Sequence, residues 1–101
     1  MMPQIKQTII DTFIPFNPQR ILLFGSQARG DADEYSDIDV IIVYPTEKRF
    51  LDRLKELYMA WNMPIAIDIL AYTPDEYRKM KAENIFVQEV DKESEVLYEG
   101  Y

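Results

Sequence analysis

The chain has 101 residues and a formal net charge of −7. This length and charge predict one small acidic domain, residues 1–101, with a single core. It contains no cysteine and no histidine, so disulfides, thiol chemistry and imidazole ligands are excluded, and a general base must be a carboxylate or a metal-bound water. The acidic balance argues against direct nucleic-acid binding, and the sequence shows no signal peptide or membrane-spanning run, so we expect a cytoplasmic protein.

The first segment predicts a helix over residues 2–14, followed by a strand. Ile5, Ile9 and Phe13 recur at helical spacing and would form one apolar face of that helix. Two prolines then break the chain. The apolar run that follows, residues 20–24, predicts a buried strand.

This strand ends in a tight turn that is rich in small residues. Gly25 allows backbone angles that other residues avoid, and it allows a ligand to approach the backbone closely. We expect Ser26 to cap a short helix through Ala28, whose free N–H groups would point at an anion such as a phosphate. A P-loop is excluded because the Gly-Lys-Ser/Thr ending is absent.

The second predicted strand, residues 37–44, opens with two aspartates. Successive side chains of a strand point to opposite faces, so Asp37 and Asp39 share one face. Their charges repel each other and are costly to desolvate. No lysine or arginine occurs between Asp31 and Glu47, so a local salt bridge is not the expected compensation. Mg²⁺ takes carboxylate and phosphate oxygens as ligands, and the pattern therefore predicts a magnesium site.

Residues 47–61 predict an amphipathic helix. Its apolar side would pack on the core and consists of Phe50, Leu51, Leu54, Leu57, Tyr58 and Trp61. Its opposite, solvated side consists of Lys48, Asp52, Arg53, Lys55 and Glu56. Packing in the core explains the aromatic residues of this helix better than a platform for adenine does.

The third predicted strand, residues 65–71, carries Asp68 in the middle of an apolar run. A carboxylate in this position should be paired or metal-bound, and no basic residue lies between Lys55 and Arg78. Asp68 would join the first two aspartates as the third carboxylate of a two-metal site. The alternative is a residue of an edge strand that faces solvent.

The remaining sequence predicts two helices and a last strand. Thr73 is the N-cap of the first helix, a proline takes its first position, and Glu76 completes a capping box. Residues 85–93 predict a second, short helix, and residues 95–98 predict the strand. The inward-facing residues of the short helix are expected to be Phe86 and Val90.

Gly25 and Ser26 are followed by ten residues and then by Asp37, Ile38 and Asp39. This pattern, Gly-Ser-x10-Asp-x-Asp, resembles the signature of the nucleotidyltransferase superfamily that includes DNA polymerase β. The turn GSQARG, the chain length and the ending EVLYEG resemble more closely the minimal nucleotidyltransferases, the MNT family. The resemblance covers nearly the whole chain. It implies an α/β (α+β) fold of the polymerase β type, a small mixed sheet flanked by helices.

The resemblance also implies a role for each residue of the pattern. Gly25 and Ser26 would hold the triphosphate of ATP while an acceptor hydroxyl attacks the α-phosphate and pyrophosphate leaves. The catalytic carboxylates, which would also bind two Mg²⁺ ions, are Asp37, Asp39 and Asp68. Arg29 would steady the nucleotide or the turn, or would instead form an ion pair with Asp31 or Asp33.

Members of the MNT family are commonly encoded beside a HEPN-domain protein, typically a toxic RNase, and serve as its antitoxin by transferring AMP to a tyrosine of the toxin. The resemblance therefore implies Mg²⁺-dependent transfer of AMP from ATP to a tyrosine hydroxyl of a HEPN toxin. Two alternatives remain open: a small-molecule nucleotidyltransferase of the antibiotic-modifying kind, and a non-catalytic antitoxin that neutralises its partner by binding. The sequence leaves the nucleotide preference and a homo- or hetero-oligomeric state undecided.

Overall fold

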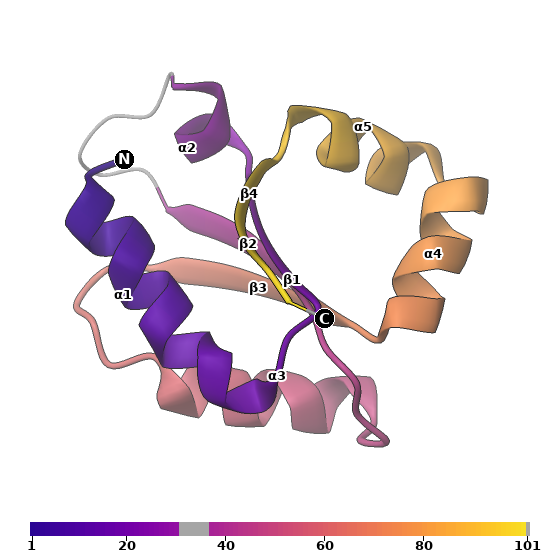
Figure 1. Cartoon of the computed structure of the whole chain (residues 1–101), viewed down its shortest axis with the longest axis horizontal. Coiled ribbons are helices and arrows are strands. Elements are labelled where there is room, and N and C mark those ends of the chain that lie inside the picture. The colour runs from indigo at the N-terminus through magenta and orange to yellow at the C-terminus, as the bar shows by residue number, and fades with distance from the viewer. Residues whose placement is uncertain (31–36, 101) are drawn as a thin grey trace.

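A mixed β-sheet lies at the centre of the fold, with helices on both of its faces (Figure 1). The computed structural model describes residues 1–30 and 37–100. Within these residues the strands are β1 (Arg20–Phe24), β2 (Ile38–Val43), β3 (Ile67–Tyr72) and β4 (Glu95–Glu99). The helices are α1 (Pro3–Phe13), the 3-10 turn η1 (Ile14–Phe16), α2 (Ser26–Arg29), α3 (Phe50–Ala60), α4 (Pro74–Glu83) and α5 (Ile85–Glu93).

The strands follow the order β3-β2-β1-β4 across the sheet. β1 pairs antiparallel with both β2 and β4, whereas β2 and β3 run parallel. Parallel neighbours need a crossover connection, and α3 supplies it between β2 and β3. β3 and β4 are therefore the two edge strands. This arrangement of a small mixed sheet with helices on both faces is the fold class that the sequence implies.

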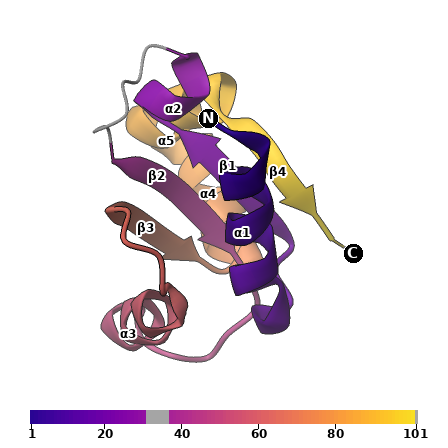
Figure 2. The same ribbon diagram turned by 90° about the vertical axis from the view of Figure 1, so that its left-hand side faces the viewer.

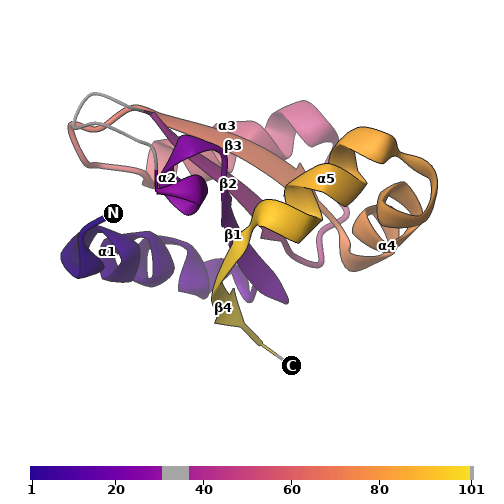
Figure 3. The same cartoon turned by 90° about the horizontal axis from the view of Figure 1, so that it is seen from above.

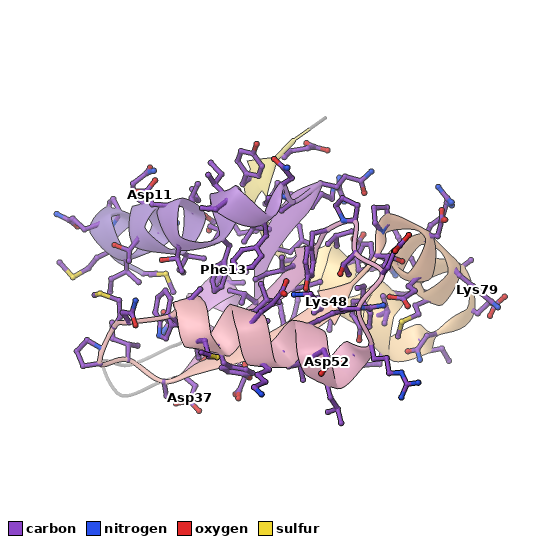
Figure 4. The ribbon with its side chains drawn as sticks, turned by 90° about the horizontal axis from the view of Figure 1, so that it is seen from below. Asp11, Phe13, Asp37, Lys48, Asp52 and Lys79 are labelled. Carbon is purple, nitrogen blue, oxygen red and sulfur yellow. The ribbon has the colours of Figure 1, made fainter. Side chains whose placement is uncertain are left out.

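The first hydrophobic core lies between the sheet and the helices α1 and α3. Figure 2 shows α1 in front of the sheet, with α4 and α5 behind it. β2 contributes alternate residues to this core, namely Ile38, Val40 and Ile42. Phe13 projects from α1 toward α3 (Figure 4), is fully buried and stacks on Trp61 with ring centroids 6.2 Å apart. Leu57 of α3 is buried in the same core.

The second core lies on the opposite face of the sheet, against α4 and α5. Figure 3 shows these two helices following one another on the side of the molecule away from α1. The buried residues here come from β1, β2, α4 and α5, and are Leu22, Ile41, Val43, Tyr77, Val87 and Val90. Asp39 alternates with Ile38 and Val40 along β2, so its side chain belongs to this face.

α3 lies within the predicted range 47–61, but its orientation differs from the prediction. Leu51 is 77% exposed, and Phe50 and Tyr58 also lie on the surface. Arg53, predicted on the solvated side, is only 7% exposed. The reason is that α3 packs mainly against the edge strand β3, which offers a narrow apolar surface and covers only part of the apolar side of the helix.

Arg53 joins α3 to β3 and α4. Its Nη1 and Nη2 donate to the two carboxylate oxygens of Glu76, at 2.6 and 3.2 Å. Its Nε donates to the carbonyl of Lys48 at 2.7 Å, and Nη1 also donates to the carbonyl of Ala71 at 3.4 Å. Hydrogen bonding to Arg53 lowers the pKa of Glu76. Glu76 also completes the predicted capping box with Thr73.

The other boundaries agree closely with the sequence, with one error of orientation. α5 covers residues 85–93 as predicted, but Phe86 is 59% exposed, and the inward-facing residues are Val87 and Val90. β2 begins one residue later than predicted and β3 two residues later.

In the part of the chain that the structure describes, none of the helices has the length and apolar character needed to cross a bilayer.

Candidate active site

Asp39 and Asp68 lie side by side on neighbouring strands. They are register partners in the parallel pairing of β2 with β3, and a hydrogen bond joins their carboxyl groups. Asp39 is half-buried, whereas Asp68, on the edge strand, is exposed. The structure thus brings together two of the three predicted carboxylates. The solvent-facing edge position considered for Asp68 is also observed, and it leaves this side of the pair open.

The pKa of the Asp39 carboxyl is raised above its ordinary value. Partial burial is the largest cause, because desolvation disfavours the charged form. The charge of Asp68, the hydrogen bond to it and the charge of Asp37 act in the same direction, whereas the charge of Arg29 opposes them. Burial and the neighbouring negative charges together thus outweigh the effect of Arg29 on this pKa. When protonated, Asp39 donates its hydrogen bond to Asp68.

Asp37 immediately precedes β2 and is exposed. Figure 4 shows it at the opposite end of the molecule from Lys79 on α4. Its charge acts on Asp39, but among residues 1–30 and 37–100 no three side chains of the Asp, Glu, His or Cys types gather closely enough to hold a metal ion. The three predicted carboxylates are therefore arranged as a close pair, Asp39 and Asp68, with Asp37 beside it.

The backbone of Gly25 packs directly against the side chain of Asp39. Gly25 has φ 73° and ψ −155°, a conformation that is essentially confined to glycine. A Cβ atom at this position would overlap the Asp39 carboxylate. The turn comes close to Asp39 because Phe24, the last residue of β1, is the register partner of Asp39. Glycine is thus needed here both for its backbone angles and for the space it leaves.

The helix α2 begins one residue earlier than the predicted cap allows. Gly25 is the N-cap, without a side-chain hydrogen bond, and Ser26 is the first helical residue. The carbonyl of Ser26 accepts a hydrogen bond from the N–H of Gly30 at 3.0 Å. The prediction that Ser26 caps this helix is wrong, because the positive φ of Gly25 already turns the chain into α2.

Glu93, the last residue of α5, reaches the turn from the other side. Its Oε1 accepts a hydrogen bond from the N–H of Gly25 and another from Nη1 of Arg29, both at 3.3 Å. Arg29 thus forms an ion pair, one of its two predicted roles, but with Glu93. The predicted partners, Asp31 and Asp33, lie outside the described residues.

Sequence reasoning missed Glu93 because no motif includes it and it lies far from the Gly-Ser turn along the chain. One signal in the sequence could have drawn attention to it. The C-terminal end of a helix carries a partial negative charge, so an acidic residue in the last helical position is unfavourable there. A glutamate that ends a predicted helix therefore needs a positively charged or hydrogen-bonding partner elsewhere in the fold.

The model of the nucleotidyltransferase domain family matches residues 5–99, nearly the whole chain. The chain belongs to this family. It is therefore a nucleotidyltransferase, and the Gly-Ser turn with the adjacent pair of aspartates is the candidate active site of the enzyme.

Two proteins named as protein adenylyltransferases are similar to this nucleotidyltransferase. MntA of Haemophilus influenzae is 32% identical over 93 residues, which cover 87% of this chain and 80% of that protein. MJ0141 of Methanocaldococcus jannaschii is 35% identical over 82 residues, which cover 81% of each chain. The family to which the chain belongs thus includes relatives that carry the name of one specific activity, transfer of an adenylyl group to protein.

Two solved structures share the fold of this chain. A nucleotidyltransferase from Sulfolobus solfataricus superimposes with a TM-score of 0.65, covering 96% of this chain and 81% of that one at 21% identity. A chain in the crystal structure of a toxin–antitoxin with AMP-PNP superimposes with a TM-score of 0.69, covering 93% and 73% at 23% identity. At these identities the likeness concerns the fold.

The donor atoms of this nucleotidyltransferase suit a magnesium ion. Asp39 and Asp68 supply carboxylate oxygens on adjacent strands, and the charge of Asp68 adds to burial in raising the pKa of Asp39. Mg²⁺ is usually held by one or two carboxylates together with substrate phosphates. Two aspartates and the phosphates of a nucleotide therefore form a suitable ligand set.

A cavity of about 640 Å³ opens at the other end of the sheet. Its walls come from the segments that follow β2 and β3, and include Pro45, Thr46, Glu47, Thr73, Pro74 and Asp75. Because the two strands are parallel, this cavity lies a full strand length away from Asp39 and Asp68, which stand near the strand starts. The aspartate pair is the better candidate for phosphate chemistry, because nucleotidyl transfer depends on neutralising phosphate charge rather than on an apolar cavity.

Proposed function

We propose that this nucleotidyltransferase transfers AMP from ATP to a hydroxyl group of a partner protein, and that the partner is a toxin that the transfer inactivates. The observation that carries the proposal is the pairing of Asp39 with Asp68 directly beside the backbone of Gly25. This juxtaposition brings a carboxylate pair suited to Mg²⁺ next to a backbone that a phosphate can approach closely.

Asp39 and Asp68 would hold Mg²⁺ together with the phosphates of the nucleotide, and Asp37, whose charge acts on Asp39, stays a predicted third ligand. The bound metal ion supplies neutralisation of phosphate charge and a lowered pKa for a nearby hydroxyl group. On the protein side, Gly25 packs against Asp39 and the charge of Arg29 acts on it, so the N–H of Gly25 and the guanidinium of Arg29 would contact the triphosphate. Positioning and charge neutralisation would supply most of the catalysis.

The reaction exchanges a phosphoanhydride bond of ATP for a phosphoester bond to the acceptor. The acceptor oxygen forms a bond to the α-phosphorus of ATP as the bond from that phosphorus to the bridging oxygen breaks, and pyrophosphate leaves with the electron pair. The proton of the acceptor hydroxyl needs a base, and the chain has no histidine. Asp68 is exposed and lies beside Asp39, so its carboxylate is the group we assign to receive that proton.

The acceptor would come from another molecule, because Asp68 lies on the open edge of the sheet. A tyrosine of a HEPN-domain toxin is the acceptor we propose. The relatives named protein adenylyltransferases support a protein acceptor, and the fold shared with a chain of a toxin–antitoxin with AMP-PNP supports a toxin as that protein. The tyrosine and the HEPN domain rest on the resemblance to the MNT family. A tyrosine hydroxyl has a pKa near 10, within reach of a carboxylate base assisted by a cation.

The test is a labelling experiment with the purified chain, the protein encoded beside it, Mg²⁺ and ATP labelled at the α-phosphate. We expect label on the partner, and we expect Asp39→Asn/Asp68→Asn to reduce it by about a hundredfold or more, as for loss of a group that stabilises charge in the transition state. Mass spectrometry of the labelled partner would identify the modified residue.

Asp52→Asn is the matched control, since Asp52 is an exposed aspartate of α3 on the other face of the sheet (Figure 4). It removes one negative charge and should leave labelling unchanged. Tight binding of the partner without label would favour a non-catalytic antitoxin. Labelling of a small hydroxyl compound in place of the partner would favour the antibiotic-modifying alternative.

A further inference from the structure

A carboxylate of the protein itself occupies hydrogen-bond donors beside the candidate active site. Oε1 of Glu93 accepts from the backbone N–H of Gly25 and from Nη1 of Arg29, with both donor–acceptor distances at 3.3 Å. Figures 1 and 3 show the C-terminal end of α5, where Glu93 lies, on the side of α2. A single oxygen thus receives a main-chain amide and a guanidinium, two groups that commonly bind anions in proteins.

The position of Glu93 on its own helix does not explain this contact. Glu93 is the last residue of α5, where the partial negative charge of the helix end repels a carboxylate. A lysine precedes it, Lys92, which suits the helix end and pairs weakly with Glu89 at 3.8 Å. The favourable partners of Glu93 therefore lie outside α5, in the Gly25–Arg29 turn that contains α2.

The contact is also built so that it can open. The side chain of Glu93 is 34% exposed, both hydrogen bonds are at the long end of the normal range, and a glutamate can rotate toward solvent. Gly25, in contrast, is held next to Asp39 by its packing against the carboxylate, and the charge of Arg29 acts on the same carboxylate. An anion with more charge than a carboxylate would compete well for the same donors.

We propose that Glu93 is an internal competitor of the nucleotide: its carboxylate occupies the phosphate-binding donors of Gly25 and Arg29 in the nucleotide-free protein and leaves them when the triphosphate binds. The inference rests on the proposed function and adds to it a residue that sets nucleotide affinity. Only the fraction of molecules in which Glu93 has moved away binds the triphosphate, so the apparent affinity is lowered by that fraction.

Calorimetric titration with MgATP tests the proposal on the wild type, Glu93→Gln and Glu93→Ala. Glutamine keeps the shape and one acceptor oxygen but loses the charge, so it should compete less, and alanine should not compete at all. We expect the Kd for MgATP to fall about threefold in Glu93→Gln and about tenfold in Glu93→Ala, the range expected for loss of one competing hydrogen-bonded contact. In labelling assays KM for ATP should fall while kcat stays within about twofold.

Glu89→Gln is the matched control, one helical turn earlier on α5 and with its side chain 68% exposed. It removes the same charge without touching the turn, and its Kd should equal that of the wild type.

If Glu93 only braces the turn, the order of affinities reverses: Glu93→Ala binds MgATP most weakly and Glu93→Gln partly restores binding. That order, or an unchanged Kd in both variants, would overturn the inference while leaving the proposed function intact. Absence of MgATP binding in every chain would overturn the proposed function itself and this inference with it.

Discussion

At Gly25 the backbone has room for a hydrogen atom and nothing larger, because the carboxylate of Asp39 fills the adjacent space. Gly25 thus sets the distance between the turn and the aspartate pair. The nearby Gly30 also has a positive φ, 81°, but no atom of the described residues lies within 4 Å of the position where its Cβ would stand. A substitution at Gly30 should therefore cause backbone strain alone, whereas a substitution at Gly25 should cause strain and also displace Asp39.

We predict that Gly25→Ala lowers the labelling rate about a hundredfold, because even an ångström of displacement of a reacting group has an effect of that size. It should also lower the free energy of unfolding by about 1–3 kcal/mol through backbone strain. Labelling assays and urea unfolding measure the two effects.

Gly30→Ala is the comparison, with an expected strain of about 1–2 kcal/mol and a labelling rate close to that of the wild type. Equal loss of activity in both variants would mean that strain in the turn, rather than contact with Asp39, controls the rate.

The sequence was sufficient for some residues of the candidate site and insufficient for others. Asp39 and Asp68 could be paired in advance because strand periodicity and the absence of nearby cations both pointed to them. Glu93 could not, since its contact with Gly25 depends on how α5 is placed over the sheet. The ion pair of Arg29 with Glu93 could not be foreseen for the same reason, because the two residues are far apart in the sequence and only the fold brings them together.

At the scale of elements, strands and caps were easier to predict than the rotation of helices. The capping box of α4 is a local pattern, and it formed as predicted. The orientation of α3 and α5 depends on the surface that receives them. The narrow edge strand β3 leaves Leu51 in solvent, and it draws Arg53 inward toward the carboxylate of Glu76. Hydrophobic periodicity alone does not carry that information.

Arg53→Lys tests the connection between α3 and α4. A lysine cannot make the two parallel hydrogen bonds to Glu76 or also reach the carbonyl of Lys48, so we predict a loss of about 1–3 kcal/mol in the free energy of unfolding. Urea denaturation at neutral pH measures it.

Arg78→Lys provides the reference, because Arg78 pairs with Asp75 on the exposed surface of α4 and should change stability by less than about 0.5 kcal/mol. A similar, small effect of both substitutions would show that the buried position of Arg53 contributes little to stability.

At the scale of the whole molecule, the aspartate pair makes stability depend on pH and on cations. The pKa of Asp39 is higher in the folded than in the unfolded chain, so the folded state binds the proton more tightly. The contribution of Asp39 to stability is therefore favourable at low pH and is lost as pH rises through its folded pKa. At neutral pH the ionised carboxylate works against the fold.

We accordingly predict that Asp39→Asn has a melting temperature equal to or above that of the wild type at pH 7, even though it should abolish transfer. The difference should shrink as the pH is lowered toward the ordinary aspartate value near 3.8, because the wild type then gains its proton. Thermal unfolding followed between pH 4 and pH 7 tests this. A large loss of stability in Asp39→Asn at pH 7 would show that the carboxylate pair supports the fold instead.

The parallel pairing of β2 with β3 has a consequence for the route by which the chain folds. Asp68 approaches Asp39 only when β3 docks on β2 after the α3 crossover, so their mutual repulsion arises at that one step. If β3 has already docked in the folding transition state, the repulsion slows folding, and if it docks afterwards, the repulsion speeds unfolding. Divalent cations that bind the pair would then act on the corresponding arm of the chevron plot, so that the ions proposed for catalysis would also change the kinetics of strand docking.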